Sequence, residues 1–196
     1  MSFVCLVTIQ TSRSESAIWS LSRTSGDWNT AANWTPATVP NGFSDAATFG
    51  FSNLHDISIE GFVIVRQITF TPAATTAYTI TIQPTTLMFN NILTIRGNGI
   101  ANNSGVTQNF VAKGNALGYY GSITFGDSAT AGSETAFTTF GAAVAGEGGF
   151  GGFVTFESTT SAADGSFTNN GGLVAGGRGG AGKQISSMHL PPAIPP

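Results

Sequence analysis

The stretch ITFGDSATAGSETAFTTFGAAVAGEGG, residues 123–149, decides the fold, because a similar stretch, VTFESTTSAADGSFTNNGGLVAGGRGG, follows at residues 154–180. The segment ITF recurs as VTF 31 residues later, and Phe137 corresponds to Phe167 at an offset of 30 after a one-residue deletion. Each copy holds three short strand-like segments, ITF, AFTTF and AVAG in the first, separated by Gly, Ser, Asp and Asn. This repeat predicts one three-sided coil of a parallel β-solenoid, in which each coil stacks on the next.

Short runs in which apolar and polar residues alternate precede the repeat and reach its first residues. They lie at 57–60, 67–70, 77–82, 92–97 and 122–125. Such alternation places the apolar side chains of a strand on one face, and helical patterns are nearly absent. We therefore predict an all-β fold, a right-handed parallel β-helix with an N-terminal cap. A β-sandwich is the alternative, but the dipeptides typical of hairpins are missing between the runs, and the repeat is longer than one hairpin.

The same patterns divide the chain into four segments. Residues 1–16 are apolar without a basic start, which suggests a weak or truncated export signal or an edge strand. Residues 17–56 form the predicted cap and residues 57–182 the coils. Residues 183–196 end in four prolines among the last six residues. Because proline lacks the N–H that a sheet needs, we expect this tail to be disordered.

Composition excludes several classes of function. Charged residues make up 9 % of the chain, against roughly 25 % in an average soluble protein, and neutral polar side chains with 26 glycines take their place. The seven Lys and Arg residues are scattered singly, so no basic stripe is available for nucleic acid. No apolar run approaches the roughly 18 residues that a membrane-spanning helix needs, so we expect no transmembrane segment.

The front of the chain resembles a known family. The segment AIWSLSRTSGDWNTAANWTPATVPNGFSDAATFG at residues 17–50, LTIRGNGIANNSGVTQNFV at 93–111 and the following coils are similar to bacterial autotransporter-type surface proteins with repetitive β-helical passenger regions. The resemblance covers about residues 17–182. It implies a secreted β-helix that is displayed on, or released from, the bacterial outer-membrane surface. The chain departs from the family pattern in lacking the strands of a translocator barrel and in its poor signal.

The carboxylates do not form the pairs that a β-helical polysaccharide lyase or hydrolase would use. Asp127 and Glu157 fall near corresponding turns of adjacent coils, but the register opposes Asp127 to Ser158 instead. Asp56 and Glu60 share a face of one strand yet lie about 13 Å apart at roughly 3.3 Å per residue, too far for a glycosidase pair. We predict no catalytic residues and a protein that is not an enzyme.

Metal and cofactor motifs are equally unconvincing. His55, His189 and the single Cys5 have no metal-ligand spacing. The pattern G-x-G-x-x-G occurs at residues 146–151 and 177–182, but the first copy precedes a strand and not the helix of a dinucleotide fold. We interpret both copies as coil turns and expect no metal and no cofactor.

Aromatic residues leave two interpretations open. The 15 phenylalanines recur mostly at strand positions, where we expect them to stack inside the solenoid. Trp19, Trp28 and Trp34 precede the first regular strands, where a cap should cover the open first coil. The same three indoles are also the candidate residues for stacking on sugar rings, in which case Trp28 and Trp34 would lie exposed on the surface.

These observations predict a non-enzymatic structural or adhesive protein, extracellular or on the bacterial outer-membrane surface. Its partners would be surface glycans or other cell-surface components. A carbohydrate-binding module that uses exposed tryptophans is the first alternative. A polysaccharide lyase or hydrolase without a recognisable active site is the second.

Overall fold

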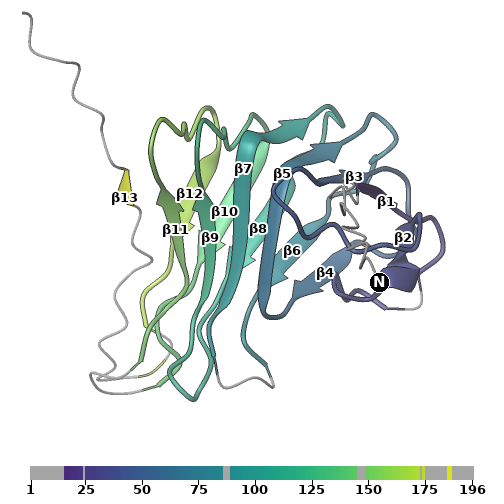
Figure 1. The fold of residues 1–196 in the computed structure, drawn as a ribbon. Coiled ribbons are helices and arrows are strands. Elements are labelled where there is room, and N and C mark those ends of the chain that lie inside the picture. The colour runs from purple at the N-terminus through teal and green to yellow at the C-terminus, as the bar shows by residue number, and fades with distance from the viewer. Residues whose placement is uncertain are drawn as a thin grey trace, which may run out of the picture.

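The computed structural model describes residues 16–23, 25–85, 89–144, 149–172, 174 and 185–186. In these residues stacked parallel strands form a β-solenoid of about five turns (Figure 1). The elements are β1 (Ala17–Trp19), η1 (Ala31–Asn33, a 3-10 turn), β2 (Trp34–Thr35), β3 (Ala46–Phe49), β4 (Asp56–Ile59), β5 (Phe62–Phe70), β6 (Thr79–Ile82), β7 (Asn91–Asn102), β8 (Gln108–Ala112), β9 (Gly121–Phe125), β10 (Thr135–Thr139), β11 (Phe153–Phe156), β12 (Ser166–Asn169) and β13 (Ile185–Ser186).

The chain alternates between two sheets as it winds. One sheet has eight strands in the order β13-β11-β9-β7-β5-β3-β1-β2, and the other has five in the order β12-β10-β8-β6-β4. Every neighbouring pair is parallel except β1 and β2, which are antiparallel. The long strands β5 and β7 change register between Val65 and Gln67, where the first sheet turns a corner. Their second halves thus provide a third side of the coil.

The predicted repeat coincides with the pairing of strands. Ile123 pairs with Val154 in β9 and β11, and Phe137 pairs with Phe167 in β10 and β12. Residues 31 or 30 apart in the sequence therefore lie directly above one another in adjacent coils. The all-β solenoid that the repeat predicted is confirmed.

The third strand-like segment of each repeat is a correction. Val144 lies in a bend, and the remaining residues of AVAG, 145 and 146, lie outside the described residues. The third side of these coils is instead made near Thr130, which bridges Gly99 of the coil before and Ser161 of the coil after. Sequence similarity in AVAG marked equivalent places in the coil, but its small residues do not form a ladder there.

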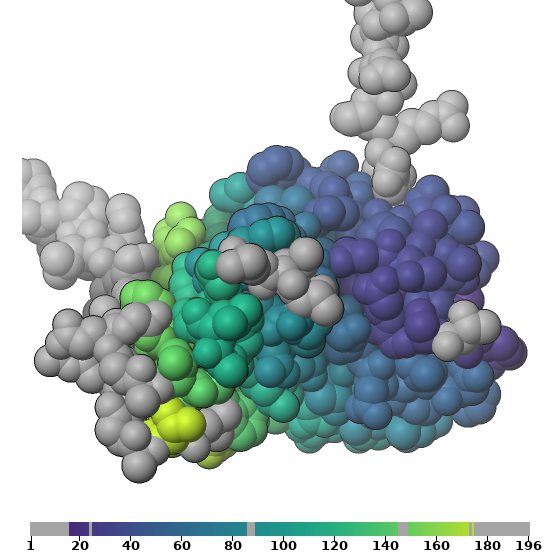
Figure 2. All heavy atoms as spheres, turned by 90° about the horizontal axis from the view of Figure 1, so that it is seen from below, coloured from purple at the N-terminus to yellow at the C-terminus, as the bar shows by residue number. Residues whose placement is uncertain are grey.

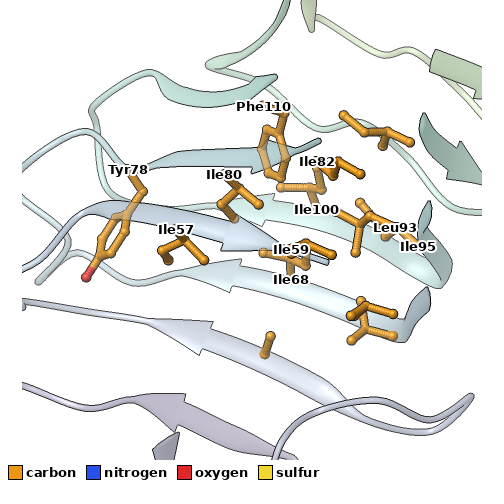
Figure 3. Close-up of a cluster of buried hydrophobic side chains, with 14 of the residues drawn as sticks. Ile57, Ile59, Ile68, Tyr78, Ile80, Ile82, Leu93, Ile95, Ile100 and Phe110 are labelled. Carbon is orange, nitrogen blue, oxygen red and sulfur yellow. The ribbon is translucent and has the colours of Figure 1, made fainter. Parts of the chain in front are cut away.

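The interior of the coil is filled by columns of identical or similar side chains. Figure 3 shows the column of Ile57, Ile80 and Phe110 and its neighbours, all buried. The ring of Phe137 continues this column and stacks on Phe110 with centroids 5.1 Å apart and an interplanar angle of 17°. Because this spacing is close to the distance between strands, each coil adds one ring to the stack. Phenylalanine stacking inside the solenoid is thus observed.

One corner repeats a left-handed backbone. Gly97, Asp127 and Ser158 have φ angles of 55°, 60° and 57° and lie 30 and 31 residues apart. The predicted opposition of Asp127 to Ser158 is seen in this shared conformation. Asp127 and Ser158 adopt it despite the steric cost that a Cβ atom brings. Asp127 also accepts a 2.9 Å hydrogen bond from Arg96 of the previous coil.

Two of the predicted segments fall largely outside the described residues. Residues 1–15 and 187–196 are not described, which leaves the export signal a prediction. Within the segment 183–196, predicted to be disordered, Ile185 and Ser186 form β13 and pair with Thr155 and Phe156 of β11. The predicted coil turn at 177–182 also lies outside the described residues. At 146–151, the described Gly151 lies so close to Gly141 that a Cβ atom would approach its Cα to 2.6 Å.

Candidate functional site

The three tryptophans lie inside the cap and not on the surface. Trp19, Trp28 and Trp34 are 1 %, 0 % and 2 % exposed. Trp34 sits between the other two, with centroids 5.0 Å from Trp19 and 4.8 Å from Trp28, and both contacts are edge to face. Phe49 of β3 contacts all three rings and joins them to the solenoid core.

Hydrogen bonds fix each indole in place. The indole N–H groups of Trp19, Trp28 and Trp34 donate to the backbone carbonyls of Leu54, Pro40 and Trp28 at 3.2, 3.1 and 2.7 Å. A ring that stacks on a sugar must leave one face open, and these three faces are covered. The geometry therefore fits a plug that closes the first coil, and the sugar-binding role proposed for these residues has no exposed face to act through.

The cap also covers the edge of the second sheet. The backbone of Gly26 and Trp28 bonds to Ser58 of β4 on both sides, at 2.9 and 3.0 Å. Arg23 is buried next to the indoles and donates to the carbonyl of Asn33 at 2.8 Å. Burial lowers the pKa of the Arg23 guanidinium, while the nearby Tyr78 raises it by a smaller amount. These contacts belong to the closure of the solenoid end.

The acidic and histidine side chains do not converge on a metal site. Across the described ranges, no group of three or more His, Cys, Asp or Glu side chains could hold an ion. Asp56 is exposed on β4, and Asp127 is paired with Arg96. His55 lies edge-on to the ring of Tyr78 with centroids 4.9 Å apart, in keeping with a turn histidine. His189 and Cys5 lie outside the described residues.

Exposed aromatic rings gather instead at the corner where β5, β7, β9 and β11 begin. We call this set the aromatic ledge; it comprises Phe62, Phe89, Tyr120, Phe150 and Phe153. These strands start at the lower edge of the view in Figure 1, and Figure 2 shows the molecule from that side. Phe62, Phe150 and Phe89 are 62 %, 58 % and 41 % exposed. These large apolar side chains stand in water while smaller ones fill the core.

The ledge has a ring cluster at each end. At one end Phe62 and Phe89 stack with centroids 5.9 Å apart and an interplanar angle of 6°. At the other end Tyr120 contacts Phe150 at 5.9 Å and Phe153 at 4.7 Å. The strand register joins the two ends, because Phe62 is linked to Phe153 through Ile92 and Ser122, which are successive partners in the sheet.

A polar hollow adjoins the first ring cluster. It has a volume of about 380 Å³ and is lined by Asp27, Asn29, Ser58, Glu60 and Thr85. Only Gly61 separates Glu60 from Phe62 in the chain. The ring of Phe89 passes within 4.0 Å of the position that a Cβ of Gly61 would occupy. Hydrogen-bonding groups and exposed rings therefore meet at one corner of the solenoid.

The sequence analysis missed the ledge, although two signals pointed to it. The residues Phe89, Tyr120 and Phe150 lie 31 and 30 residues apart, the same spacing as the coil repeat. Phe62 occupies an outward position of β5, because the alternation of that strand buries Val63 and Val65. The general expectation that phenylalanines lie inside concealed both signals.

The chain was compared with known protein families, curated proteins and solved structures, and none of them matches it. Among the described residues no helix has the length and apolar character needed to cross a membrane. The fold defines the class, an all-β solenoid with a closed N-terminal end. The arguments about function therefore rest on its surface.

Proposed function

We propose that this protein is a non-enzymatic structural or adhesive β-solenoid of the passenger type, exported and displayed on, or released from, a bacterial surface. The observation that supports it is the regular stacking of about five coils behind a neutral polar surface that carries the aromatic ledge. A rigid rod of stacked coils presents the same surface features at regular steps, and many weak contacts then add up to firm attachment.

The outer strand positions favour such a surface. Thr94, Thr124 and Thr155 form one row of register partners on β7, β9 and β11, each only partly buried. Threonine suits strands and is uncharged, so a face of this kind stays hydrated without the repulsion between coils that stacked like charges would cause. The composition, with 9 % charged residues, follows from this requirement.

Adhesion can be tested with the whole chain. Beads coated with the folded protein should be retained under flow on surfaces of immobilised bacterial or plant glycans, and beads coated with heat-unfolded protein should not. Retention that is the same for folded and unfolded protein, or none on any surface, would contradict the adhesive role. Export is tested separately by fusing the chain to a secretion signal and translocator and asking whether an antibody reaches it on intact cells.

The lyase or hydrolase alternative has its own test. Incubation with polygalacturonate and alginate would produce unsaturated uronate ends with a strong ultraviolet absorbance if the chain were a lyase, and new reducing ends if it were a hydrolase. We expect neither product. Formation of either one at a rate proportional to protein concentration would overturn the non-enzymatic assignment.

Carbohydrate binding is the second candidate function, and a specific observation favours it. Exposed rings and a polar hollow meet at one corner, which is the arrangement that small polar ligands with apolar faces require. The candidate residues differ from those predicted, because the exposed phenylalanines of the ledge take the place of the buried tryptophans. Tryptophan fluorescence is consequently a poor reporter of such binding, since all three indoles are buried.

A further inference from the structure

We propose that the aromatic ledge and the adjoining hollow form one binding site for an uncharged, linear glycan chain that runs along the solenoid axis. This inference rests on the adhesive function proposed above and names its partner. It differs from a sugar site on the tryptophans in its residues, its place and its length along the molecule.

The chemistry of a sugar ring matches the two halves of the site. A pyranose has a face of C–H groups, which packs on an aromatic ring, and an edge of hydroxyl groups, which must find hydrogen-bonding partners. Phe62 and Phe89 offer exposed aromatic surface, and Asn29, Ser58 and Glu60 in the hollow offer amide, hydroxyl and carboxylate groups beside it. An apolar peptide would use the rings but leave these polar groups without a role.

The length of the ledge indicates a chain and not a single sugar. From Phe62 to Phe153 the register passes three strand-to-strand steps. At roughly 4.8 Å a step, the two ring clusters are about 14 Å apart along the axis. A ligand that reaches both clusters must be several sugar units long. Binding at one cluster then raises the effective concentration at the other, so affinity should rise steeply with chain length.

The charges near the site favour an uncharged glycan. Two carboxylates, Asp27 and Glu60, line the hollow, and no Lys or Arg is among its lining residues. Two cations elsewhere on the described surface already have partners: Arg96 pairs with Asp127, and Lys113 lies over the ring of Phe140 at 5.0 Å. The net charge of −3 adds to this bias. A uronic-acid chain would therefore meet repulsion where an uncharged chain does not.

Isothermal titration calorimetry of the full chain tests the proposal. The probes are cellohexaose, laminarihexaose and mannohexaose as uncharged chains, the matching disaccharides, and hexagalacturonate as the anionic chain. We expect at least one uncharged hexasaccharide to bind at least about tenfold more tightly than its disaccharide and than hexagalacturonate. Phe62→Ala and Phe153→Ala should each weaken this binding about three- to tenfold, and the double variant should remove the preference for length.

The control variant is Phe51→Ala. Phe51 is 61 % exposed, much like Phe62, but it follows β3 and lies away from the starts of the strands that carry the ledge. It should bind within twofold of the unmodified protein. Glu60→Gln, which keeps the size of the side chain and removes its charge, should narrow the difference between uncharged and anionic chains. Unfolding curves of each variant establish that the fold is intact before binding is compared.

Three results would overturn the proposal: no binding of any uncharged hexasaccharide, equal binding by Phe62→Ala and Phe51→Ala, or tighter binding of hexagalacturonate. These results remain distinct from failure of the adhesive function. Beads coated with the Phe62→Ala, Phe153→Ala double variant that are still retained on glycan surfaces would place adhesion elsewhere on the solenoid and remove the ledge from it. Loss of retention in that variant, with the fold intact, supports the ledge.

Discussion

The indole N–H of Trp34 donates a 2.7 Å hydrogen bond to the backbone carbonyl of Trp28, and the two rings meet edge to face with centroids 4.8 Å apart. This pair explains why both residues occur in one short segment. The first ring covers the open coil, and the second is bound to the backbone that carries the first. Phe49 lies 5.8 and 5.7 Å from the two rings, so the cap is continuous with the core.

Trp34→Ala should destabilise the protein by about 3 to 5 kcal/mol, because it leaves a large cavity between two buried rings and an unpaired carbonyl. Trp34→Phe keeps an aromatic ring and loses the N–H donor, so a smaller loss of about 1 to 2 kcal/mol is expected. Urea unfolding measures both changes. A loss below about 1 kcal/mol for Trp34→Ala would show that the indoles do not close the solenoid.

Asn91 is a buried polar residue whose side chain joins two coils. Its carbonyl oxygen accepts from the N–H of Gly61 at 2.9 Å, and its amide donates to the carbonyl of Ile59 at 3.2 Å. Asn91→Leu fills a similar volume but leaves both backbone groups without partners. We expect a loss of about 2 to 4 kcal/mol, since each buried unpaired group costs about 1 to 3 kcal/mol. Chemical denaturation tests this value, and Asn98→Leu at an exposed position of β7 is the control.

Ser158 offers the opposite case, a substitution that should stabilise. It is exposed and has a φ of 57°, in the left-handed region where a Cβ atom is unfavourable. Ser158→Gly should raise the free energy of unfolding by about 0.5 to 1 kcal/mol, after the greater entropy of glycine in the unfolded chain is subtracted. Ser158→Val should lower it. Thermal unfolding distinguishes the two, and a destabilised glycine variant would contradict the left-handed corner.

The sequence predicted the coil because its period was visible in letters at Phe137 and Phe167. Earlier coils keep the same spacing with different letters, as when Ile80 pairs with Phe110, so the strands could be predicted there and their pairing could not. The role of Trp28 depended on exposure, which a sequence does not state. The ledge escaped notice because Phe62 and Phe70 are the same residue type, and only the parity of β5 sends one outward and the other inward.

Tyr78 gives the protein a weakness at high pH. Burial raises the pKa of Tyr78 to about 12, while a hydrogen bond with Ser52 and the charge of Arg23 act in the opposite direction. Because the unfolded phenol ionises near pH 10, the folded state binds more protons between pH 10 and pH 12, and stability falls as the pH rises through this range. At pH 11 the loss from this group should be about 1.4 kcal/mol.

Urea unfolding at pH 9 and pH 11 tests the Tyr78 prediction by comparison with Tyr78→Phe. The phenylalanine variant should be the less stable at pH 9, because the hydroxyl of Tyr78 donates to the carbonyl of Gly50 at 2.6 Å. It should lose less stability than the unmodified protein on going to pH 11. An equal loss in both proteins would show that the phenol ionises alike in the folded and unfolded states.

Phe137 and Phe62 should respond very differently to truncation, although both are phenylalanines on strands. Phe137 is 1 % exposed and stacks between Phe110 and Phe167, so Phe137→Ala should cost about 3 to 5 kcal/mol. Phe62 is 62 % exposed, and Phe62→Ala should change stability by no more than about 0.5 kcal/mol. Denaturation of the two variants side by side measures the difference. A large loss in Phe62→Ala would mean that the ring supports the fold, and it would remove the reason to seek a ligand for the ledge.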